Sequence, residues 1–491
     1  MAARKLRIAI IGAGMSGILC AIKLRAAGYD DFQIFEKAES LGGTWLHNRY
    51  PGLSCDIPSH VYAYSFAPNP SWSQKYSPGP EIRAYLERIA DDFDVRRVMR
   101  FGVEITRCEF VDGAWTLVAG EEVLGQFDAV LAATGILHHP RDVAFPGLDT
   151  FAGPAFHTAR WPDDVSLDAQ RVGIIGTGST AIQIVTDVVE RVRSLKLFQR
   201  TAQWIWPEAN SYYSEDDKAR FKEPGTLQHI RQRMSSVIDE RFSNALVDVD
   251  GEAMQALEQE CRDNLERSIS DPDLRRKLTP DYRAGCKRLI MSAGFYEAIQ
   301  HPNADVVTDA IETIEPRGIL TKDGRRHELD VLVLATGFNA HQFMRPMELV
   351  GVDGVTLDEV WSESVYAYRS IALPEFPNFF MLMGPQSPVG NFSLIDVAEI
   401  QFAYIVQLLD RLASDADAVV APTHAATRRF TDEVVAAMKN TIWVTGCASW
   451  YLDDRGVPIT WPWTVQDFAD SMREVVWADF QSAGYHGAAV S

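Results

Sequence analysis

The stretch LRIAIIGAGMSG at residues 6–17 decides how this chain begins to fold. Its first half is a short, largely apolar run, which predicts a buried strand of a parallel sheet. Its second half carries three glycines at the spacing of a dinucleotide-binding turn: Gly12, Gly14 and Gly17. Residues 18–27 then predict a helix, so strand, glycine turn and helix follow in the order that this fingerprint requires.

Each glycine of this turn has a separate physical task. Gly12 permits the tight turn, Gly14 lets the backbone approach a pyrophosphate, and Gly17 lets the helix pack closely on the strand. The helix N-terminus supplies amide donors for phosphates. A second predicted strand at residues 33–35 ends at Glu36, whose carboxylate can accept hydrogen bonds from a ribose diol.

The same order recurs in the middle of the chain. A predicted strand at residues 172–175 precedes the turn GTGSTA and a helix that continues to Val189. The third glycine is replaced here by Ala181, which the pattern tolerates. The residues of this unit that we expect to bind a dinucleotide are Gly176, Gly178, Ser179, Thr180, Arg200 and Thr201.

The two units differ in charge at the end of the second strand, which is followed by Glu36 in the first unit and by Gln199-Arg200 in the second. Glu36 lies 19 residues after Gly17, and Arg200 lies 19 residues after Ala181. A carboxylate repels the 2′-phosphate of NADPH, whereas a guanidinium binds it. We therefore predict FAD in the first unit and NADPH in the second. The alternative for Arg200 is a solvated charge at the end of a strand.

Two similar segments indicate where the chain passes between the units. AVLAATG at residues 129–135 and VLVLATG at residues 331–337 each predict an apolar strand that ends in a Thr-Gly turn. Apolar residues between them, such as Leu227, Ile230 and Met234, keep helical spacing. The expected fold is α/β, with two Rossmann-like dinucleotide-binding domains and a helical insertion: residues 1–140 and 341–491 for FAD, 141–208 and 285–340 for NADPH, and 209–284 for the insertion.

Charge and cysteine usage exclude several classes of protein. The 491 residues include 67 acidic and 47 basic side chains, a net charge of −20, which argues against nucleic acid or an anionic membrane as a partner. The six cysteines form no CxxC pair, so we expect neither a dithiol redox centre nor a metal site. A reduced, cytoplasmic protein fits this pattern. The chain has no uninterrupted 18-residue apolar stretch, so no membrane span is expected.

Two further segments resemble type I Baeyer–Villiger monooxygenases, a class of flavoprotein monooxygenases. FAGPAFHTARWP at residues 151–162 fills every fixed position of the FxGxxxHxxxWP fingerprint, namely Phe151, Gly153, His157, Trp161 and Pro162. A second family pattern includes Gly43, Thr44 and Trp45, continues through Tyr50-Pro51-Gly52 and ends at Asp56.

The resemblance implies an enzyme that uses FAD, NADPH and dioxygen to insert an oxygen atom next to a ketone carbonyl, through a C4a-peroxyflavin, and so forms an ester or lactone. The segment GCKR at residues 285–288 is similar to the family's GxKR. By that resemblance Arg288 stabilises the peroxide anion, Asp56 orients Arg288, and Lys287 helps Arg200 to hold the 2′-phosphate. The segment around Asn391 is expected beside the flavin ring.

The resemblance also suggests a role for His157. The fingerprint lies in a linker between domains, so we interpret it as a hinge that couples NADPH binding to the site, and not as a proton-transfer group. A lone histidine is more often a packed or capping residue than a catalyst.

Three other functions share part of these features. A flavin-containing monooxygenase that oxidises amines or sulfides shares the two glycine turns, but Asp56, the Trp-Pro ending and Arg288 count against it. A disulfide reductase requires CxxC, and a non-catalytic nucleotide sensor has no need of Asp56 and Arg288. The ketone stays unassigned. We expect an apolar, aromatic-lined region at Tyr62, Tyr64, Phe66 and Trp72. The C-terminal aromatic residues resemble a segment of some family members and fit the pocket wall or the core equally: Trp443, Trp450 and Tyr451.

Overall fold

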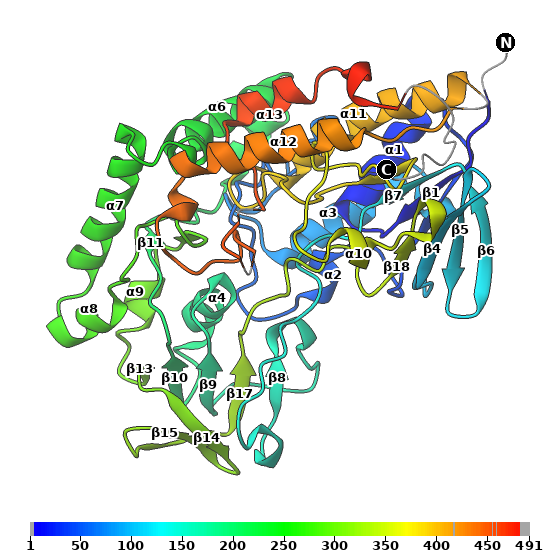
Figure 1. The fold of residues 1–491 in the computed structure, drawn as a ribbon. Coiled ribbons are helices and arrows are strands. Elements are labelled where there is room, and N and C mark those ends of the chain that lie inside the picture. Colours follow the sequence, from blue (N-terminus) through cyan, green and yellow to red (C-terminus); the bar gives the residue numbers. More distant parts are fainter. Residues whose placement is uncertain (1–3, 416–417, 454, 458, 482–491) are drawn as a thin grey trace.

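Two parallel sheets, each the centre of an α/β unit, dominate the structure. The computed structural model describes residues 4–415, 418–453, 455–457 and 459–481. Both sheets have five strands, and every pairing within them is parallel. Figure 1 shows them as separate bodies, one near the N-terminus and one below the helix α4 (Ser179–Val188).

The first sheet is built around the strand that the opening stretch predicts. All four residues of β1 (Ile8–Ile11) are buried, as expected of a central parallel strand. The strand order is β19-β7-β1-β2-β3. The other strands are β2 (Phe32–Phe35), β3 (Met99–Arg100), β7 (Ala129–Ala132) and β19 (Phe379–Met381).

Helices and a smaller sheet cover this first sheet. One hydrophobic core contains residues of the sheet and of α1 (Met15–Ala26), α3 (Gly79–Asp92) and α11 (Leu394–Ser414). A four-stranded sheet with the order β18-β4-β5-β6 packs against the other face and shares a second core with it. Its strands are β4 (Arg107–Val111), β5 (Ala114–Ala119), β6 (Glu122–Phe127) and β18 (Glu348–Val350).

The second sheet repeats this plan with different strands. Its order is β13-β10-β9-β17-β8. The strands are β8 (Ala155–His157), β9 (Arg171–Ile175), β10 (Ser194–Phe198), β13 (Ala304–Val307) and β17 (Val331–Leu334). Smaller pairings lie beside it: β11 (Ile205–Trp206) with β12 (Ile290–Met291), and β14 (Ile311–Glu315), β15 (Gly318–Thr321) and β16 (Arg326–Glu328).

The insertion is helical, as predicted. It contains α5 (Glu215–Phe221), α6 (Thr226–Ile238), a π-helical turn (Asp239–Ser243), α7 (Glu252–Ser268) and α8 (Pro272–Leu278). The remaining helices are α2 (Thr44–His47), α9 (Phe295–Ala298), α10 (Leu357–Val360), α12 (His424–Ala437) and α13 (Val465–Ser471). In the part of the chain that the structure describes, no helix is both long and apolar enough to cross a bilayer.

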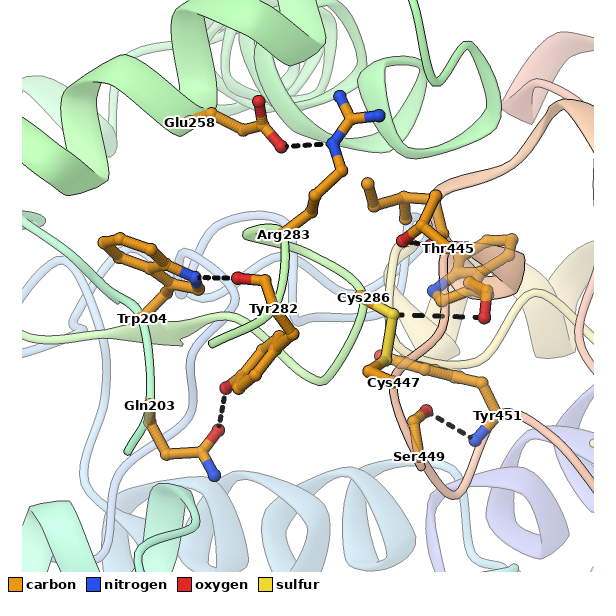
Figure 2. Close-up of a disulfide and its surroundings, with 12 residues drawn as sticks. Gln203, Trp204, Glu258, Tyr282, Arg283, Cys286, Thr445, Cys447, Ser449 and Tyr451 are labelled. Carbon is orange, nitrogen blue, oxygen red and sulfur yellow. Dashed lines mark hydrogen bonds and ion pairs between the residues drawn. A yellow bond between two sulfur atoms is a disulfide. The ribbon is translucent and has the colours of Figure 1, made fainter. Parts of the chain in front are cut away.

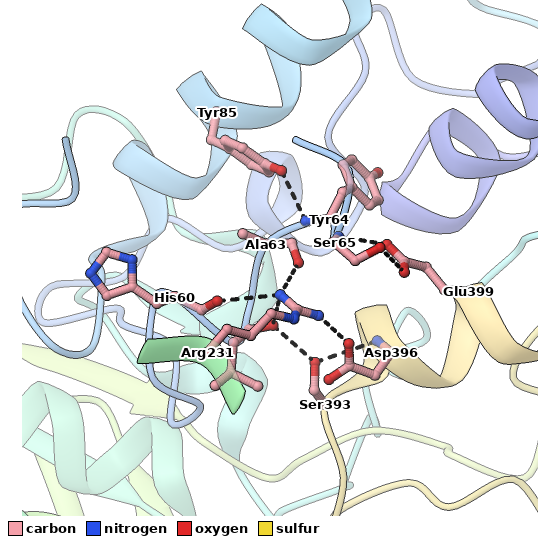
Figure 3. A network of polar contacts seen from close by, with 10 residues as sticks. His60, Ala63, Tyr64, Ser65, Tyr85, Arg231, Ser393, Asp396 and Glu399 are labelled. Carbon is pink, nitrogen blue, oxygen red and sulfur yellow. Dashed lines mark hydrogen bonds and ion pairs between the residues drawn. The ribbon is translucent and has the colours of Figure 1, made fainter. Parts of the chain in front are cut away.

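One arginine fastens the insertion to the first unit (Figure 3). Arg231 on α6 donates hydrogen bonds to the backbone carbonyls of His60, Val61 and Ala63 at 3.2, 3.1 and 2.6 Å. It also forms an ion pair with Asp396 in the first turn of α11. Burial raises the pKa of Asp396 to about 6, although the charge of Arg231 opposes this shift. The insertion is therefore anchored at two elements of the first unit.

The predicted fold class is confirmed, but the expectation that all cysteines are reduced is wrong. Cys286 and Cys447 form a disulfide, while the other four cysteines are free and buried. The two partners are 161 residues apart, so no local spacing reveals the pair. The fold brings them together because the C-terminal segment returns to the loop between α8 and β12.

Candidate active site

A large pocket brings the two glycine turns to one place. It has a volume of about 1050 Å³. Gly12 and Gly14 of the first unit and Gly176 and Gly178 of the second unit all contribute to its wall, together with Arg288. Two dinucleotides bound at these turns would therefore meet within a single cavity.

The first glycine turn is shaped for a close backbone approach. Gly12 has a φ of +102°, and a Cβ there would lie 2.6 Å from the carbonyl oxygen of Ala133. A Cβ on Gly17 would overlap the carbonyl oxygen of Gly12. Gly14 faces Gly43, with 3.5 Å between a Cβ on Gly14 and the Cα of Gly43. Bare backbone thus borders the pocket at the N-terminus of α1, which fits the pyrophosphate of FAD.

Glu36 lies at the wall of this first unit and is held there by backbone amides. Its Oε2 accepts a hydrogen bond from the amide of Ala13 at 2.7 Å, and its Oε1 accepts one from Ala38 at 2.8 Å. Each oxygen retains acceptor capacity for a ribose hydroxyl. Thr44 and Trp45 line the same pocket, and the Trp45 indole donates to the hydroxyl of Tyr62 at 3.3 Å.

The second glycine turn has the same strained start and a more open middle. Gly176 has a φ of +118°, and a Cβ there would overlap the carbonyl oxygen of Ala335. A Cβ on Gly178 would meet nothing within 4 Å. Ser179, at the first turn of α4, and Thr180 line the pocket, as does Thr201. This loop fits a second dinucleotide.

Two cations converge beside this second loop. Arg200 and Lys287 both line the pocket. Burial lowers the pKa of Lys287, and the charge of Arg200 lowers it further, because the two cations are close to one another. The Lys287 ammonium also lies 4.8 Å from the ring centre of Tyr282. A pair of neighbouring cations in the wall fits a phosphate dianion.

The equal offsets of Glu36 and Arg200 do not place them at equivalent positions. In the sheets Ile11 pairs with Phe35, and Ile175 pairs with Phe198. The residue after each strand is therefore Glu36 in the first unit but Gln199 in the second. The interpretation of one shared position is wrong, because the connection from the third turn residue to the strand end is one residue shorter in the second unit. A neutral amide replaces the carboxylate, and the arginine follows it.

Arg288 stands where the units meet. It comes from the loop before β12, and its Nη2 forms an ion pair with Asp56, while its Nη1 donates to the carbonyl of Gly390 at 2.5 Å. About a quarter of its side chain, 26%, is exposed. Burial favours the neutral form of Arg288, but the charge of Asp56 and hydrogen bonds to Asp56 and Tyr451 outweigh it and hold the pKa above that of an ordinary arginine. A permanent cation thus lines the pocket.

The Tyr50-Pro51-Gly52 pattern has a structural reason. Gly52 has a φ of +77°, and a Cβ there would lie 2.5 Å from the carbonyl oxygen of Gln183 on α4. The hydroxyl of Tyr50 donates to the side chain of Gln183 at 3.0 Å, and Gln183 donates to the carbonyl of Ser54 at 3.0 Å. The turn therefore fixes the segment that ends in Asp56 onto the second unit.

The linker fingerprint supports the pocket from behind. His157 is buried; its Nδ1 accepts from the amide of Ala159, so its Nε2 donates to the carbonyl of Gly337 at 3.1 Å. Burial lowers the pKa of His157. The carbonyl of Trp161 accepts a hydrogen bond from Arg49 of the first unit at 3.3 Å. With both ring nitrogens bonded to backbone, His157 joins β8 to the turn after β17.

Several predicted residues lie outside the pocket wall. Gly17 acts through packing, and Phe151, Gly153, His157, Trp161 and Pro162 stand behind the wall, which the linker reaches through Thr158. Asn391 is fully buried, and its side-chain atoms have no hydrogen-bond partner among the described residues. Its neighbours Gly390 and Phe392 do line the pocket.

The aromatic residues divide between wall and core. Tyr62 and Trp450 line the pocket. Tyr64 and Trp72 are buried in the core of the first unit, and Phe66 packs against that core, so the expectation of an aromatic-lined region there is wrong. Sequence reasoning missed the disulfide and the place of Tyr451 beside Arg288, because Cys447 and Tyr451 come from the distant C-terminal segment.

Comparisons with known proteins agree with this site. A family model described as flavin-binding monooxygenase-like matches residues 5–414. An uncharacterised monooxygenase of Mycobacterium tuberculosis is 46% identical, over 93% of this chain and 92% of that protein. A Baeyer–Villiger monooxygenase of Streptomyces coelicolor is 40% identical, over 97% of this chain and 92% of that protein.

A solved structure is similar over almost the whole chain. It is cyclohexanone monooxygenase from Rhodococcus sp. Phi1 bound to NADP⁺, with a TM-score of 0.87 and 28% identity, covering 99% of this chain and 100% of that one. The prediction of a monooxygenase that uses FAD and NADPH is thereby confirmed. The chain belongs to the flavin-binding monooxygenase-like family, and within that family to the type I Baeyer–Villiger monooxygenases.

Proposed function

We propose that this chain converts a ketone and dioxygen into an ester or lactone, with Arg288 as the catalytic cation and Asp56 as the residue that orients it. The observation that carries the proposal is the Arg288–Asp56 ion pair on the wall of a pocket shared by both glycine turns. Reduced FAD supplies the electrons that activate dioxygen. Side chains and backbone groups of this chain bind the cofactors and stabilise the negative charge that develops on oxygen.

Arg288 suits oxygen transfer to a carbonyl group because that reaction places negative charge on oxygen. A preorganised cation in a site shielded from water stabilises such charge strongly. Asp56 and Gly390 hold the guanidinium from two sides, so it needs no reorganisation during the reaction. An amine or sulfide oxygenase needs no such cation, and this difference favours a ketone as the substrate.

The two cofactors have separate places in this proposal. Gly12, Gly14, Gly43 and Glu36 hold FAD along α1, and Gly176, Gly178 and Ser179 hold NADPH along α4. Arg200 and Lys287 hold the 2′-phosphate of NADPH. The closeness of these two cations supports this role. The segment around Asn391 borders the pocket through Gly390 and Phe392, which supports its place beside the flavin. Cyclohexanone, in the name of a structural relative, is a cyclic ketone and supports this substrate class.

The sheet topology also supports limits for the two dinucleotide-binding domains. We propose that residues 1–140 and 341–491 form the FAD domain and that residues 141–208 and 285–340 form the NADPH domain. The return of β19 to the first sheet supports this division. The cytoplasmic location stays a prediction, and the Cys286–Cys447 disulfide weakens the cysteine argument for it.

Arg288→Ala tests the proposal. NADPH needs no anionic oxygen in order to reduce the flavin, so this variant should keep bound FAD and still be reduced. It should lose at least about 100-fold in ester formation, since removing one oxyanion donor costs about 3 kcal/mol. Its electrons should pass instead to dioxygen, which is released as hydrogen peroxide. The measurements are flavin absorbance, anaerobic reduction and product analysis with a panel of linear, cyclic and aryl ketones.

Arg107→Ala is the matched control. Arg107 forms surface ion pairs with Glu109 and Glu348 on the small sheet, so ester formation should stay at the wild-type rate. An Arg288→Ala enzyme that also makes ester at that rate would remove Arg288 from the mechanism. A wild-type enzyme that oxidises thioethers but no ketone would point to heteroatom oxidation instead.

A further inference from the structure

A third group besides Asp56 and Gly390 holds the guanidinium of Arg288. The phenol of Tyr451, in the C-terminal segment, lies close to the Arg288 side chain, and the polar interaction between them shifts the pKa of both groups. Tyr451 is buried, with 1% of its surface exposed. The ring of Tyr451 is therefore part of the protein interior beside Arg288.

The tyrosine ring is itself fixed in position. A Cβ on Gly390 would overlap the Tyr451 hydroxyl, so the ring lies directly against the backbone of the residue whose carbonyl accepts from Arg288. Trp443 and Trp450 pack on the ring, with centroids 5.4 and 4.3 Å away. The phenol, the Gly390 carbonyl and the guanidinium therefore form one compact contact.

The disulfide ties this segment to the loop that carries Arg288 (Figure 2). Cys447 lies four residues before Tyr451, and Cys286 lies two residues before Arg288. The amide of Tyr451 also donates to the hydroxyl of Ser449 at 3.1 Å. Tyrosine and arginine are thus linked by a short covalent path through the bond between the two cysteines.

We propose that Tyr451 is a positioning residue for Arg288, held against Gly390 by its tryptophan neighbours and by the Cys286–Cys447 disulfide. The proposal rests on the proposed role of Arg288. Asp56 and Gly390 constrain the guanidinium through its two terminal nitrogens, and Tyr451 adds a contact from a third element. Loss of the phenol oxygen should widen the range of orientations that Arg288 samples.

Tyr451→Phe is the decisive variant, because it keeps the ring and removes only the oxygen. We expect unchanged FAD content, an unchanged rate of anaerobic reduction by NADPH, and a drop of about fivefold in ester formed per NADPH, as the loss of one hydrogen bond predicts. In the same FAD-loaded enzyme, phenylglyoxal should modify Arg288 about fivefold faster, as measured by peptide mass spectrometry.

Tyr85→Phe is the matched control. Tyr85 is equally buried, at 1% exposure, and its hydroxyl donates to the carbonyl of Ala67 at 2.7 Å on α3's side of the first unit. Its loss should lower the melting temperature without changing ester yield or Arg288 modification. A role of Tyr451 in general stability alone would make both variants behave alike, and that result overturns the proposal.

The double variant Cys286→Ser/Cys447→Ser supplies a second arm. It should also speed Arg288 modification, though less than Tyr451→Phe does. Wild-type rates of Arg288 modification in both variants would overturn the proposal. A wild-type enzyme that makes no ester from any ketone would instead refute the proposed function, and the modification rates would still decide whether Tyr451 holds Arg288.

Discussion

The two dinucleotide-binding units of this chain share one architecture but differ in how much space their glycine turns leave for a side chain. In both, the first glycine of the turn has a positive φ and lies against the carbonyl group of the residue that follows a neighbouring strand, Ala133 for Gly12 and Ala335 for Gly176. The third position differs. Gly17 leaves no room for a side-chain atom above the carbonyl of Gly12, whereas the second unit carries the buried Ala181 there.

The units also differ in how they present charge. Glu36 bonds to the backbone of its own glycine turn, so the acid is part of the turn's structure as well as a ligand for ribose. In the second unit Gln199 occupies that register position and donates to the carbonyl of Lys277 at 2.6 Å. Arg200, one residue later, is exposed in the pocket. The first unit thus uses its charge to close the turn, and the second leaves its charge free for the cofactor.

The largest effect is expected from a substitution at the third position of the first glycine turn. Gly17→Ala puts a methyl group onto the Gly12 carbonyl oxygen, so α1 or the turn must shift. We expect a loss of about 3 kcal/mol or more in the free energy of unfolding and loss of most bound FAD. Urea denaturation and the flavin absorbance of the purified protein measure the two effects.

The reciprocal change is the control for that variant. Ala181→Gly removes one buried methyl group and loosens a helix, which should cost about 1–2 kcal/mol and leave FAD content unchanged. If Gly17→Ala is no more damaging than Ala181→Gly, the close packing of α1 on its turn is not what the first unit requires.

Arg200→Ala tests the difference in charge. Removal of a charge-assisted contact to phosphate should cost about 1.5–3 kcal/mol and raise the KM for NADPH about 10- to 100-fold. The KM for NADH, which has no 2′-phosphate, should hardly change. Steady-state kinetics with both nucleotides measure this. A wild-type preference for NADH would contradict the assignment of Arg200.

His157→Ala sharpens the comparison at the linker between the units. The variant loses a buried hydrogen bond to Gly337 and one from Ala159, so about 1–3 kcal/mol of stability should be lost. If the linker is a hinge, ester formation should slow while FAD stays bound. Loss of flavin or failure to fold would make His157 a structural residue and remove the hinge interpretation.

Local patterns predicted most of this fold, and long-range contacts account for what they missed. The strands and turns around Gly12 and Gly176 follow from apolar runs and glycine spacing within a few residues. Arg288 and Asp56 came only from the family resemblance, since a Lys-Arg pair in an isolated sequence indicates a solvated surface. The Cys286–Cys447 disulfide joins residues whose spacing carries no signal.

Sequence offsets alone did not identify equivalent positions in the two units. Equal offsets suggested that Glu36 and Arg200 occupy equivalent positions, but the sheet registers show that Gln199 is the counterpart of Glu36. Register depends on where each strand pairs with its neighbour, and one residue fewer in a connection shifts the whole count. Arg200, the residue after Gln199, also lines the pocket, so its place beside the second dinucleotide stays a prediction.

The smallest expected effect distinguishes the two cations of the second unit by pH. Because burial and Arg200 lower the pKa of Lys287, its ammonium loses its proton at a lower pH than an ordinary lysine does, while Arg200 stays charged. The charge that holds the 2′-phosphate therefore falls as the pH rises and Lys287 loses its proton, so the KM for NADPH should increase by about threefold as the pH is raised. Lys287→Met should raise the KM for NADPH at neutral pH and remove most of its rise with pH, whereas Lys287→Arg should keep a low KM that does not change with pH.

NADH provides the internal control, since its KM should change neither with pH nor with these substitutions. A rise for NADPH that persists unchanged in Lys287→Met would assign the titration to another group and leave Arg200 as the cation that selects the phosphate.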